Sequence, residues 1–437
     1  MERKEHELNF SRRKFVQTSA GVAATGALLG KRAFAAPRPI KIGYVSPETG
    51  PLAPFGEADS FVVDQVRKVV HAGIQSGGTT RPVEILVRDS QSSPNRCAEV
   101  AASLIKADKI DLMLVAGTAD TVNPVADQCE VNGVPCVSTD APWQPYFFGR
   151  GGNPAKGFDW TYHLFWGIEL VSQVMCDIME GVPTNKTVGL LLGDDLEGSL
   201  FSDKVKGFPP IFEKRGFNVF DPGRFQMNSN DFSAQISAYK KANAEILFGN
   251  MSAPVFANFW SQAAQQAYKP KIGLIGKALL FPSGVDSLGP RGKYLTCEIW
   301  WSPAYPFKSS LTGQSAAQLC EAFEAATKKQ WLAALGFRYA LFEIAVDVFK
   351  RAQNPELAAS VIDAVRTTKL TTIVGPAQWQ GPPPNEWVQN PVKNVCTTPM
   401  VSGQWVPGKK WPYDIVVTDN RRYPLIPVQR KMMPLPA

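Results

Sequence analysis

Short apolar segments that end in loops of small and polar residues recur along this chain, and this pattern restricts its fold more than any other feature. The first segment, residues 40–45, alternates apolar and polar residues as a β-strand does. Residues 46–56 follow with several Pro and Gly residues, which interrupt regular structure. Apolar residues then recur at helical spacing over 61–70. The opening unit is therefore predicted as strand, loop and helix.

The same alternation of strand and helix continues along the chain. The nearly continuous apolar run at 111–115 is typical of a strand buried on both faces of a parallel sheet. A second block with the same order begins near residue 159. Further strands are expected at 82–88, 134–137, 187–192 and 244–250, and further helices at 98–105 and 336–352. This alternation predicts an α/β fold.

The ends of the predicted strands supply candidate ligand contacts. In open α/β sheets, ligands bind outside the carboxyl ends of the strands. Small residues there let backbone N–H groups approach an anion, and hydroxyls add further donors. The residues at two such ends are Gly117, Thr118 and Ala119, and Ser138, Thr139 and Asp140. A simpler interpretation is that the Ser and Thr residues cap the helices that follow.

The first 36 residues have the features of an export signal. Arg12 and Arg13 are followed by Phe15, then by a mildly apolar run over 16–30 and small residues at 33–35. A charged region, a short apolar region and a cleavage site form a signal peptide, and twin arginines indicate the twin-arginine route. We therefore exclude residues 1–36 from the fold and expect the mature protein in the periplasm.

Length and charge limit the remaining possibilities. A chain of 437 residues exceeds one core of usual size, so two or three domains are expected. The net charge of +7 falls to 39 basic against 36 acidic residues once the leader is removed. This nearly neutral balance lacks the excess of basic residues that is typical of proteins that bind DNA or RNA. No apolar run reaches the roughly 18 uncharged residues of a membrane span.

The seven cysteines give little support for a metal or redox site, because no pair is spaced Cys-x-x-Cys. Their odd number leaves at least one thiol free or paired between chains. In an exported protein, Cys97, Cys129 and Cys136 are the best candidates for a bridge, because they fall in neighbouring α/β units. Burial of unpaired cysteines is an equally good interpretation.

Several motifs resemble those of one family. The loop with Pro47, Thr49, Gly50 and Pro51, which ends in an aromatic residue and Gly56, is similar to the opening loop of type I periplasmic solute-binding proteins of the leucine/isoleucine/valine-binding class. These proteins serve ABC importers. Residues 230–236, 337–352 and 371–376 also match the family's later motifs in order. The resemblance extends over roughly residues 40–420.

The resemblance implies two Rossmann-like lobes with parallel sheets, joined by a hinge of several crossovers. The expected first lobe comprises 37–157 plus 298–385, and the expected second lobe comprises 158–297 plus 386–437. Such a protein captures a small amino-acid-like or carboxylate/amide ligand between its lobes and delivers it to ABC permease subunits in the membrane. It is expected to be a monomer without cofactor, metal or nucleic acid.

Twelve residues are expected at the ligand. They are Phe55, Gly117, Thr118, Ala119, Ser138, Thr139, Asp140, Tyr162, Trp166, Asn250, Lys277 and Trp300. Ala119 and Pro142 stand where amino-acid-binding members usually carry a hydroxyl, and Lys277 stands near the position of their ammonium-binding acid. A lysine there would favour an anionic or neutral amide-like ligand. Trp160, Trp166, Trp300 and Trp301 would favour a planar or bulky one if they face the cleft.

Two other functions compete with this hypothesis. An exported α/β hydrolase with a serine nucleophile needs a histidine base beside it, but residues 37–437 hold only His71 and His163 and no Gly-x-Ser-x-Gly. Clusters of metal ligands are also missing from the sequence. Asp194 and Asp195 could act as an acid or a base, but we interpret them as solvated carboxylates of a loop. We therefore expect no enzyme. A ligand-sensing domain without a transport partner is the other alternative.

Overall fold

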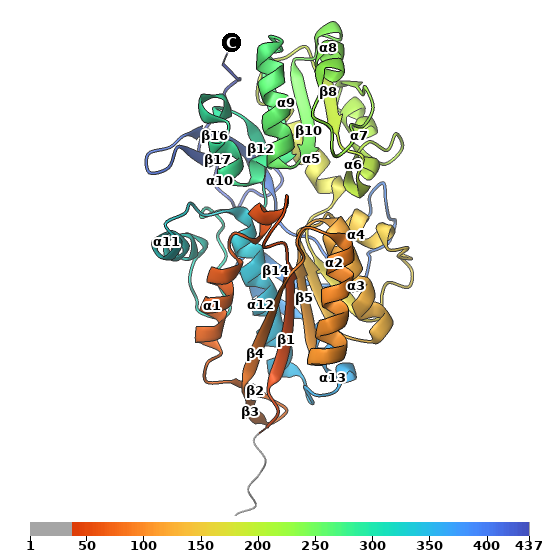
Figure 1. Cartoon of the computed structure of the whole chain (residues 1–437), viewed down its shortest axis with the longest axis vertical. Coiled ribbons are helices and arrows are strands. Elements are labelled where there is room, and N and C mark those ends of the chain that lie inside the picture. Colours follow the sequence, from red (N-terminus) through yellow and green to blue (C-terminus); the bar gives the residue numbers. More distant parts are fainter. Residues whose placement is uncertain (1–36, 437) are drawn as a thin grey trace, which may run out of the picture. The chain divides into compact units, whose positions relative to one another are not determined.

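The computed structural model describes residues 37–436, and the chain from Arg38 onward forms one compact unit. The predicted twin-arginine leader lies outside these residues. Among the described helices, none combines the length and the apolar character needed to cross a membrane. The two lobes discussed below both belong to the unit that starts at Arg38 (Figure 1).

The first lobe is built on a six-stranded sheet in the order β15-β7-β6-β5-β1-β4. All its neighbouring strands pair in parallel. Its strands are β1 (Ile40–Ser46), β4 (Val83–Asp89), β5 (Leu112–Ala116), β6 (Cys136–Thr139), β7 (Thr161–Leu164) and β15 (Val395–Cys396). Two hairpins accompany it, β2 (Ile74–Ser76) with β3 (Thr79–Arg81), and β13 (Lys369–Thr372) with β14 (Gly375–Gln378).

The second lobe is built on a seven-stranded sheet in the order β17-β16-β12-β11-β10-β8-β9. Strands β9, β8, β10, β11 and β12 pair in parallel. Strands β16 and β17 extend the sheet beyond β12 in antiparallel pairing. The strands are β8 (Thr187–Leu192), β9 (Asn218–Phe220), β10 (Ile246–Met251), β11 (Ile272–Lys277), β12 (Thr296–Ile299), β16 (Val401–Pro407) and β17 (Tyr413–Asp419).

Helices cover both faces of each sheet, as parallel sheets require. Around the first sheet lie α1 (Asp59–Val69), α2 (Pro94–Ser103), α3 (Ala119–Asn132), α4 (Trp143–Gly149), α11 (Ala316–Thr327), α12 (Ala333–Arg351) and α13 (Ala358–Arg366), with short turns at Ala53–Gly56 and Leu104–Asp108. Around the second lie α5 (Ile168–Met179), α6 (Leu196–Phe201), α7 (Phe208–Lys214), α8 (Ser233–Lys241), α9 (Ala253–Gln265) and α10 (Pro282–Asp286), with short turns at Ala278–Leu280 and Gly289–Gly292.

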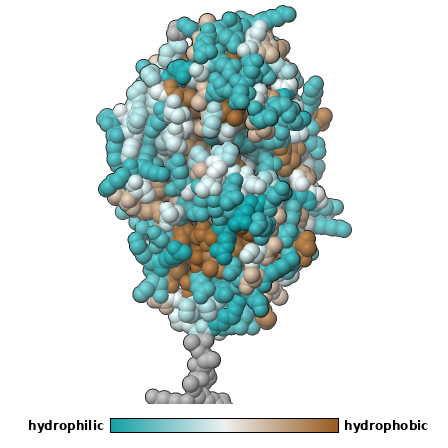
Figure 2. All heavy atoms as spheres, in the orientation of Figure 1, coloured by the Kyte–Doolittle hydropathy of each residue, from teal (hydrophilic) through white to brown (hydrophobic). Residues whose placement is uncertain are grey.

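Strand β5 shows how the sequence positions these layers. All five of its residues are buried. Leu112 and Leu114 pack in the core that includes α1 and α12, whereas Met113 and Val115 pack in the core beneath α2 and α3. Successive side chains of a strand point to opposite faces, so an unbroken apolar run is needed to fill both. The other side of the helices faces solvent, and hydrophilic residues dominate the view in Figure 2.

The α/β fold with two lobes and parallel sheets is confirmed, and the chain passes between the two sheets three times. These passages follow β7, β12 and β15. Residues 161–164 and 395–396, which were expected in the second lobe, therefore pair in the first sheet, and residues 298–299, which were expected in the first lobe, pair in the second sheet. Their assignment was wrong because strand neighbours are set by long-range pairing, which the local sequence does not encode.

All seven cysteines are free and buried. The bridge considered among Cys97, Cys129 and Cys136 is not formed in the structure. Burial raises the pKa of the Cys97 thiol to about 11 and that of Cys129 well above its ordinary range. Since the thiolate is the reactive form, these side chains serve as small apolar groups in the core.

Candidate functional site

A cavity lies where the carboxyl ends of strands from both sheets meet. Each of its principal lining residues stands at, or shortly after, the end of a parallel strand. The first lobe contributes Phe55, Thr118, Asp140 and Trp166, and the second contributes Glu197, Asn250, Lys277, Glu298 and Trp300. The cavity has a volume of about 30 Å³, and a water molecule needs roughly 10–15 Å³ by the same measure. A ligand held here would touch both lobes.

Direct contacts between the lobes close this cavity. The Phe55 ring meets Phe281 edge-on, with ring centroids 4.7 Å apart. The Ala119 N–H donates to Glu197 Oε1 at 3.4 Å, and Ser283 Oγ donates to Glu57 Oε1 at 3.2 Å. The lobes are thus joined by an aromatic contact and by two hydrogen bonds.

Arg338 of α12 fixes the part of the site that the first lobe supplies. Its side chain is fully buried. It donates to Asp59 Oδ1 at 3.1 Å, to the Phe55 carbonyl at 2.7 Å and to Asp140. Burial opposes ionisation of the guanidinium, but Asp140, Tyr44 and Asp59 outweigh it and raise the pKa of Arg338. A permanently charged arginine therefore ties the Phe55 loop to the turn at Asp140.

Two lining residues hold an uncommon backbone conformation. Asp140 has φ of 74° and Lys277 has φ of 55°, both in the left-handed region. Residues other than Gly adopt this region at a cost in energy, and such residues cluster at functional sites. One of these residues follows a strand of the first sheet and the other ends a strand of the second. Both residues line the cavity.

Lys277 is paired with two carboxylates of the second lobe. Its Nζ lies 2.9 Å from Asp195 Oδ2 and 3.0 Å from Glu197 Oε2. Burial opposes its charge, but Glu197 and Asp195 outweigh burial and raise its pKa. The expectation that Lys277 favours an anionic ligand assumed a free ammonium group. That assumption was wrong, because the charge is already balanced within the protein. Asp195 is also a helix cap rather than a solvated loop carboxylate, since Oδ1 accepts from the Gly198 N–H at 2.6 Å.

Glu298 also lines the cavity, but its carboxyl group differs from those of Glu197 and Asp195 in its protonation. Its side chain is 4% exposed, and Oε2 has no hydrogen-bond partner among the described residues. Burial raises the pKa of Glu298 to about 8, and the nearby charge of Glu197 adds to this effect. At neutral pH this carboxyl group is therefore mostly protonated and can both donate and accept a hydrogen bond.

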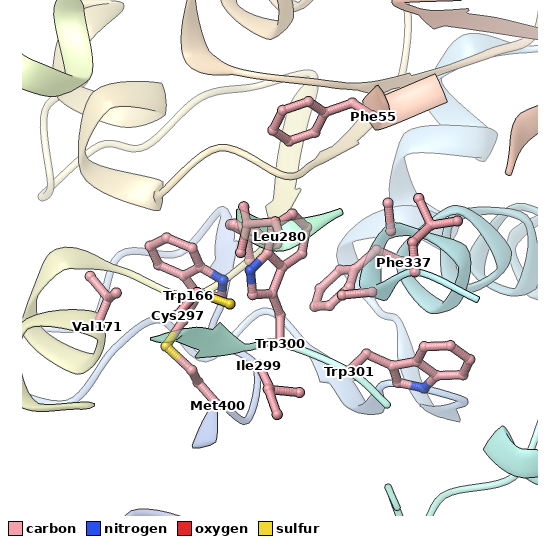
Figure 3. Packing of buried hydrophobic residues seen from close by; sticks show 14 of the residues in the cluster. Phe55, Trp166, Val171, Leu280, Cys297, Ile299, Trp300, Trp301, Phe337 and Met400 are labelled. Carbon is pink, nitrogen blue, oxygen red and sulfur yellow. The ribbon is translucent and has the colours of Figure 1, made fainter. Parts of the chain in front are cut away.

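Aromatic side chains form the remaining walls. The ring centroids of Phe55 and Trp300 are 6.3 Å apart, and those of Trp166 and Trp300 are 6.4 Å apart. Figure 3 shows Phe55 reaching from the opposite side toward Trp166 and Trp300, whereas Trp301 lies beside the helix that carries Phe337. The Trp301 Nε1–H donates to the Ile373 carbonyl at 3.0 Å. Trp301 therefore belongs to the core, not to the cavity.

The structure brings seven of the twelve expected ligand residues to this cavity. These are Phe55, Thr118, Asp140, Trp166, Asn250, Lys277 and Trp300. The five that do not line it are Gly117, Ala119, Ser138, Thr139 and Tyr162. Gly117 shapes the turn, since its φ is 143° and an added Cβ would lie 2.5 Å from Thr121 Oγ1. Tyr162 packs on Trp379 in the core.

The two hydroxyls at the end of β6 are used inside the protein. Thr139 Oγ1 donates to the Leu164 carbonyl at 2.7 Å. Ser138 Oγ lies 2.8 Å from His163 Nδ1 and 3.0 Å from the Tyr162 carbonyl oxygen. These two hydroxyls act neither as helix caps nor as ligand contacts, because both connect β6 to the neighbouring strand β7. Sequence reasoning could not see this use, which depends on which strand lies next to β6.

Three important residues of the site were missed from the sequence. Glu197 stands in the polar loop and helix after β8, and Glu298 interrupts an apolar strand. Arg338 is a charged residue in a helix whose neighbours are all apolar, aromatic or Gly over 332–342. A lone charge in a buried apolar segment is a signal of a paired or functional group. That signal was present in the sequence for Glu298 and Arg338. Within residues 37–436, no group of three or more His, Cys, Asp or Glu side chains could hold a metal ion.

The cavity lies between two α/β lobes whose sheets consist mainly of parallel strands, and the chain passes between the sheets three times. These features define the class of two-lobed solute-binding proteins. The chain belongs to the periplasmic binding protein family, whose model matches residues 39–391. Membership of this family implies an extracytoplasmic location.

Individual relatives agree with this assignment. A Leu/Ile/Val-binding protein homologue from Brucella melitensis is 24% identical over 220 residues, which are 49% of this chain and 55% of the relative. The chain thus matches about half of that relative's length. An isoleucine complex of a branched-chain amino acid transporter substrate-binding protein from Streptococcus pneumoniae has a TM-score of 0.68 at 16% identity, covering 87% of this chain and 99% of the other. A solute-binding protein from Rhodopseudomonas palustris, in complex with 3,4-dihydroxybenzoic acid, has a TM-score of 0.67 at 16% identity, covering 86% and 95%.

Proposed function

We propose that this protein is the extracytoplasmic solute receptor of an ABC importer, which captures a small amino-acid-like or carboxylate/amide molecule between its lobes. The observation that carries the proposal is the cavity lined from both sheets and closed by contacts between the lobes. Hinge closure around a ligand is the motion by which periplasmic binding proteins work. The closed, loaded form, a monomer, then docks on the membrane permease.

The relatives support the size of this ligand. Structures similar to this chain hold isoleucine in one case and 3,4-dihydroxybenzoic acid or 4-hydroxybenzoate in others. Trp166, Trp300 and Phe55 give the present cavity aromatic walls. We therefore place the ligand among small organic molecules with an apolar or planar body.

Binding without chemical change is favoured over catalysis. His163 is fully buried against β6, His71 is exposed, and neither lines the cavity. A hydrolytic serine would need such a base within hydrogen-bond reach. The carboxylates that line the cavity are already occupied by Lys277 or Arg338, with Glu298 as the exception. The site thus favours a receptor over the exported hydrolase.

A screen combined with solution scattering tests the proposal. We expect at least one amino acid, amide or aromatic acid to raise the melting temperature, because a ligand that binds the folded state stabilises it by RT ln(1 + [L]/Kd). The same ligand should reduce the radius of gyration and be recovered unchanged. Phe55→Ala should weaken binding, whereas Phe148→Ala, which lies outside the cavity lining, should not. A ligand that binds without compaction, or that is turned over, would count against the proposal.

A permease partner distinguishes an importer from a ligand sensor. The importer hypothesis expects uptake of the ligand to depend on this protein and on a membrane permease. Uptake that is unchanged after deletion of the gene would favour the ligand-sensing alternative instead.

We further propose export of the folded protein by the twin-arginine route. The support is the sequence of residues 11–15 and the apolar run that follows. Fusion of residues 1–36 to a reporter should carry it to the periplasm, and replacing Arg12 and Arg13 by Lys should abolish transport. A reporter that stays in the cytoplasm would refute this part.

A further inference from the structure

The cavity contains more carboxyl groups than the protein's own cations can balance. Glu197, Glu298 and Asp140 line it, with Asp195 directly behind. Lys277 is the one cation in the lining, and it is shared between Asp195 and Glu197. Arg338 on the opposite side is likewise divided between Asp140 and Asp59. Among residues 37–436, the lining therefore offers no unpaired cation to a carboxylate ligand.

Four polar atoms of the same lining lack partners within the described chain. They are Asp140 Oδ1, Glu298 Oε2, Trp166 Nε1 and Trp300 Nε1, on residues that are 4%, 4%, 5% and 1% exposed. Buried polar atoms are almost always hydrogen-bonded, and each exception needs an explanation. An indole N–H only donates, so Trp166 calls for an acceptor on the ligand, whereas the Trp300 N–H is close enough to the Glu298 carboxyl group to stabilise its ionised form. Asp140 Oδ1, and Glu298 Oε2 once it is ionised, call for a donor.

Resting on the proposed function, we propose that the ligand is a small planar cation, of the amidinium or protonated amine class, whose N–H groups bind Glu298 and whose body carries an oxygen acceptor. It lies between the rings of Phe55, Trp166 and Trp300. Aromatic faces attract a cation through their negative charge, and the surplus carboxylates attract it further. A ligand bearing a free carboxylate meets repulsion from Glu197 and Asp195.

Binding of a cation is coupled to loss of a proton from Glu298. The charged groups that share the cavity lining with this carboxyl group are Glu197 of α6, whose charge acts on it, Lys277 of β11, and Asp140 of the first lobe. Glu197 is paired with Lys277, and Asp140 with Arg338. Burial raises the pKa of Glu298 to about 8. A cationic ligand binds the ionised form of Glu298. Below pH 8, the affinity for the cation should therefore rise by up to about tenfold for each unit by which the pH increases.

The matched compounds 4-methoxybenzamidine, 4-methoxybenzamide and 4-methoxybenzoate test the charge directly. They share size, planarity and an ether acceptor. Across the pH range used they carry charges of about +1, 0 and −1, respectively. The charges are constant because an amidinium loses its proton well above that range and a benzoic acid loses its proton well below it. Calorimetric titration of the mature protein at pH 8 should show the amidine binding at least about tenfold more tightly than the benzoate. Between pH 6.5 and 8.5 the Kd of the amidine should fall about tenfold or more, whereas the Kd of the amide should change less than about twofold.

Glu298→Gln tests the residue. Glutamine has the shape of the protonated carboxyl group that the free protein holds at neutral pH, so the variant should fold normally. It should lose at least about tenfold in amidine affinity and lose the pH dependence. Glu321→Gln, at an exposed position of α11, should change neither.

The outcomes separate this inference from the function on which it rests. If the benzoate or the amide binds more tightly than the amidine, or if the amidine affinity does not change with pH in the wild-type protein, the inference falls and the receptor function stands. If none of the three compounds binds while the wider screen finds a ligand that is not a cation, the inference alone falls. If the screen also finds no ligand, both fall. The wild-type charge and pH series decides the question even if the Glu298 variant fails to fold.

Discussion

At the scale of single residues, Arg338 links the fold to the site. It is fully buried and holds two carboxylates and the Phe55 carbonyl. Removing one partner of a buried ion pair leaves an uncompensated charge, which costs about 3–5 kcal/mol. Arg338→Met should therefore lower the free energy of unfolding by that amount in denaturant titrations.

The control for this prediction is Arg366→Met. Arg366 pairs with Asp363 on the surface, with half or more of each side chain exposed, and such pairs contribute less than about 1 kcal/mol. Equal effects of the two substitutions would show that the buried cluster does not stabilise the fold.

His163 makes a second prediction at this scale. Its ring is fully buried, with Nε2 2.6 Å from the Ala141 carbonyl. Because that oxygen can only accept, the neutral ring carries its proton on Nε2. Burial lowers the pKa of His163 to about 3, against an unfolded value of about 6.5.

Below pH 6.5 the unfolded chain binds a proton that the folded chain does not, so stability is lost as the pH falls from about 6.5 toward 3. This group alone should cost about 1.4 kcal/mol for each pH unit in that window. His163→Phe should show a smaller decline of the unfolding free energy between pH 7 and 4.5 than the wild type. Identical slopes would contradict the assignment.

At the scale of elements, the packing of α12 depends on a glycine. A Cβ added at Gly336 would lie 2.4 Å from the Trp301 ring, which is held by its hydrogen bond to Ile373. Gly to Ala in a helix normally stabilises by about 1 kcal/mol. Here we expect Gly336→Ala to destabilise by about 1–3 kcal/mol through overpacking.

Trp301→Phe should relieve part of that cost. Its combination with Gly336→Ala should be less destabilising than the sum of the two single changes. A thermal unfolding series in which Gly336→Ala alone is more stable than the wild type would overturn this account of the helix.

The same scale shows how far the sequence predicts the fold. The strands at 40–45 and 111–115 were recognised because apolar alternation and apolar runs are local signals. The lobe of β7 was not, because its pairing with β6 and β15 joins residues as far apart as His163 and Val395. Local patterns therefore identified individual strands and helices, whereas the expected lobe bounds assigned β7, β15 and the end of β12 to the wrong sheet.

The site follows the same rule. The strand ends led to Thr118, Asp140 and Asn250, which line the cavity, because the position of a strand end is local. The charge of Lys277 could not be judged from its neighbours, since Asp195 is 82 residues away in sequence. The partners of buried charges are set by the tertiary fold.

At the scale of the whole molecule, the proposed function requires a small molecule to bind between the two sheets and to leave unchanged. The Phe55 ring of the first lobe packs against Phe281 of the second, so the loop after β1 forms one wall of the cavity. The two lobes then act as one binding surface that neither could supply alone.

A crystal structure of the protein with the best ligand from the thermal-shift screen is the most direct test. We predict that the intact ligand lies between Phe55 and Trp300, within hydrogen-bond distance of Glu298 or Asp140 and in contact with residues of both lobes. A ligand bound to one lobe alone or outside this cavity, or a chemically altered ligand, would contradict the account.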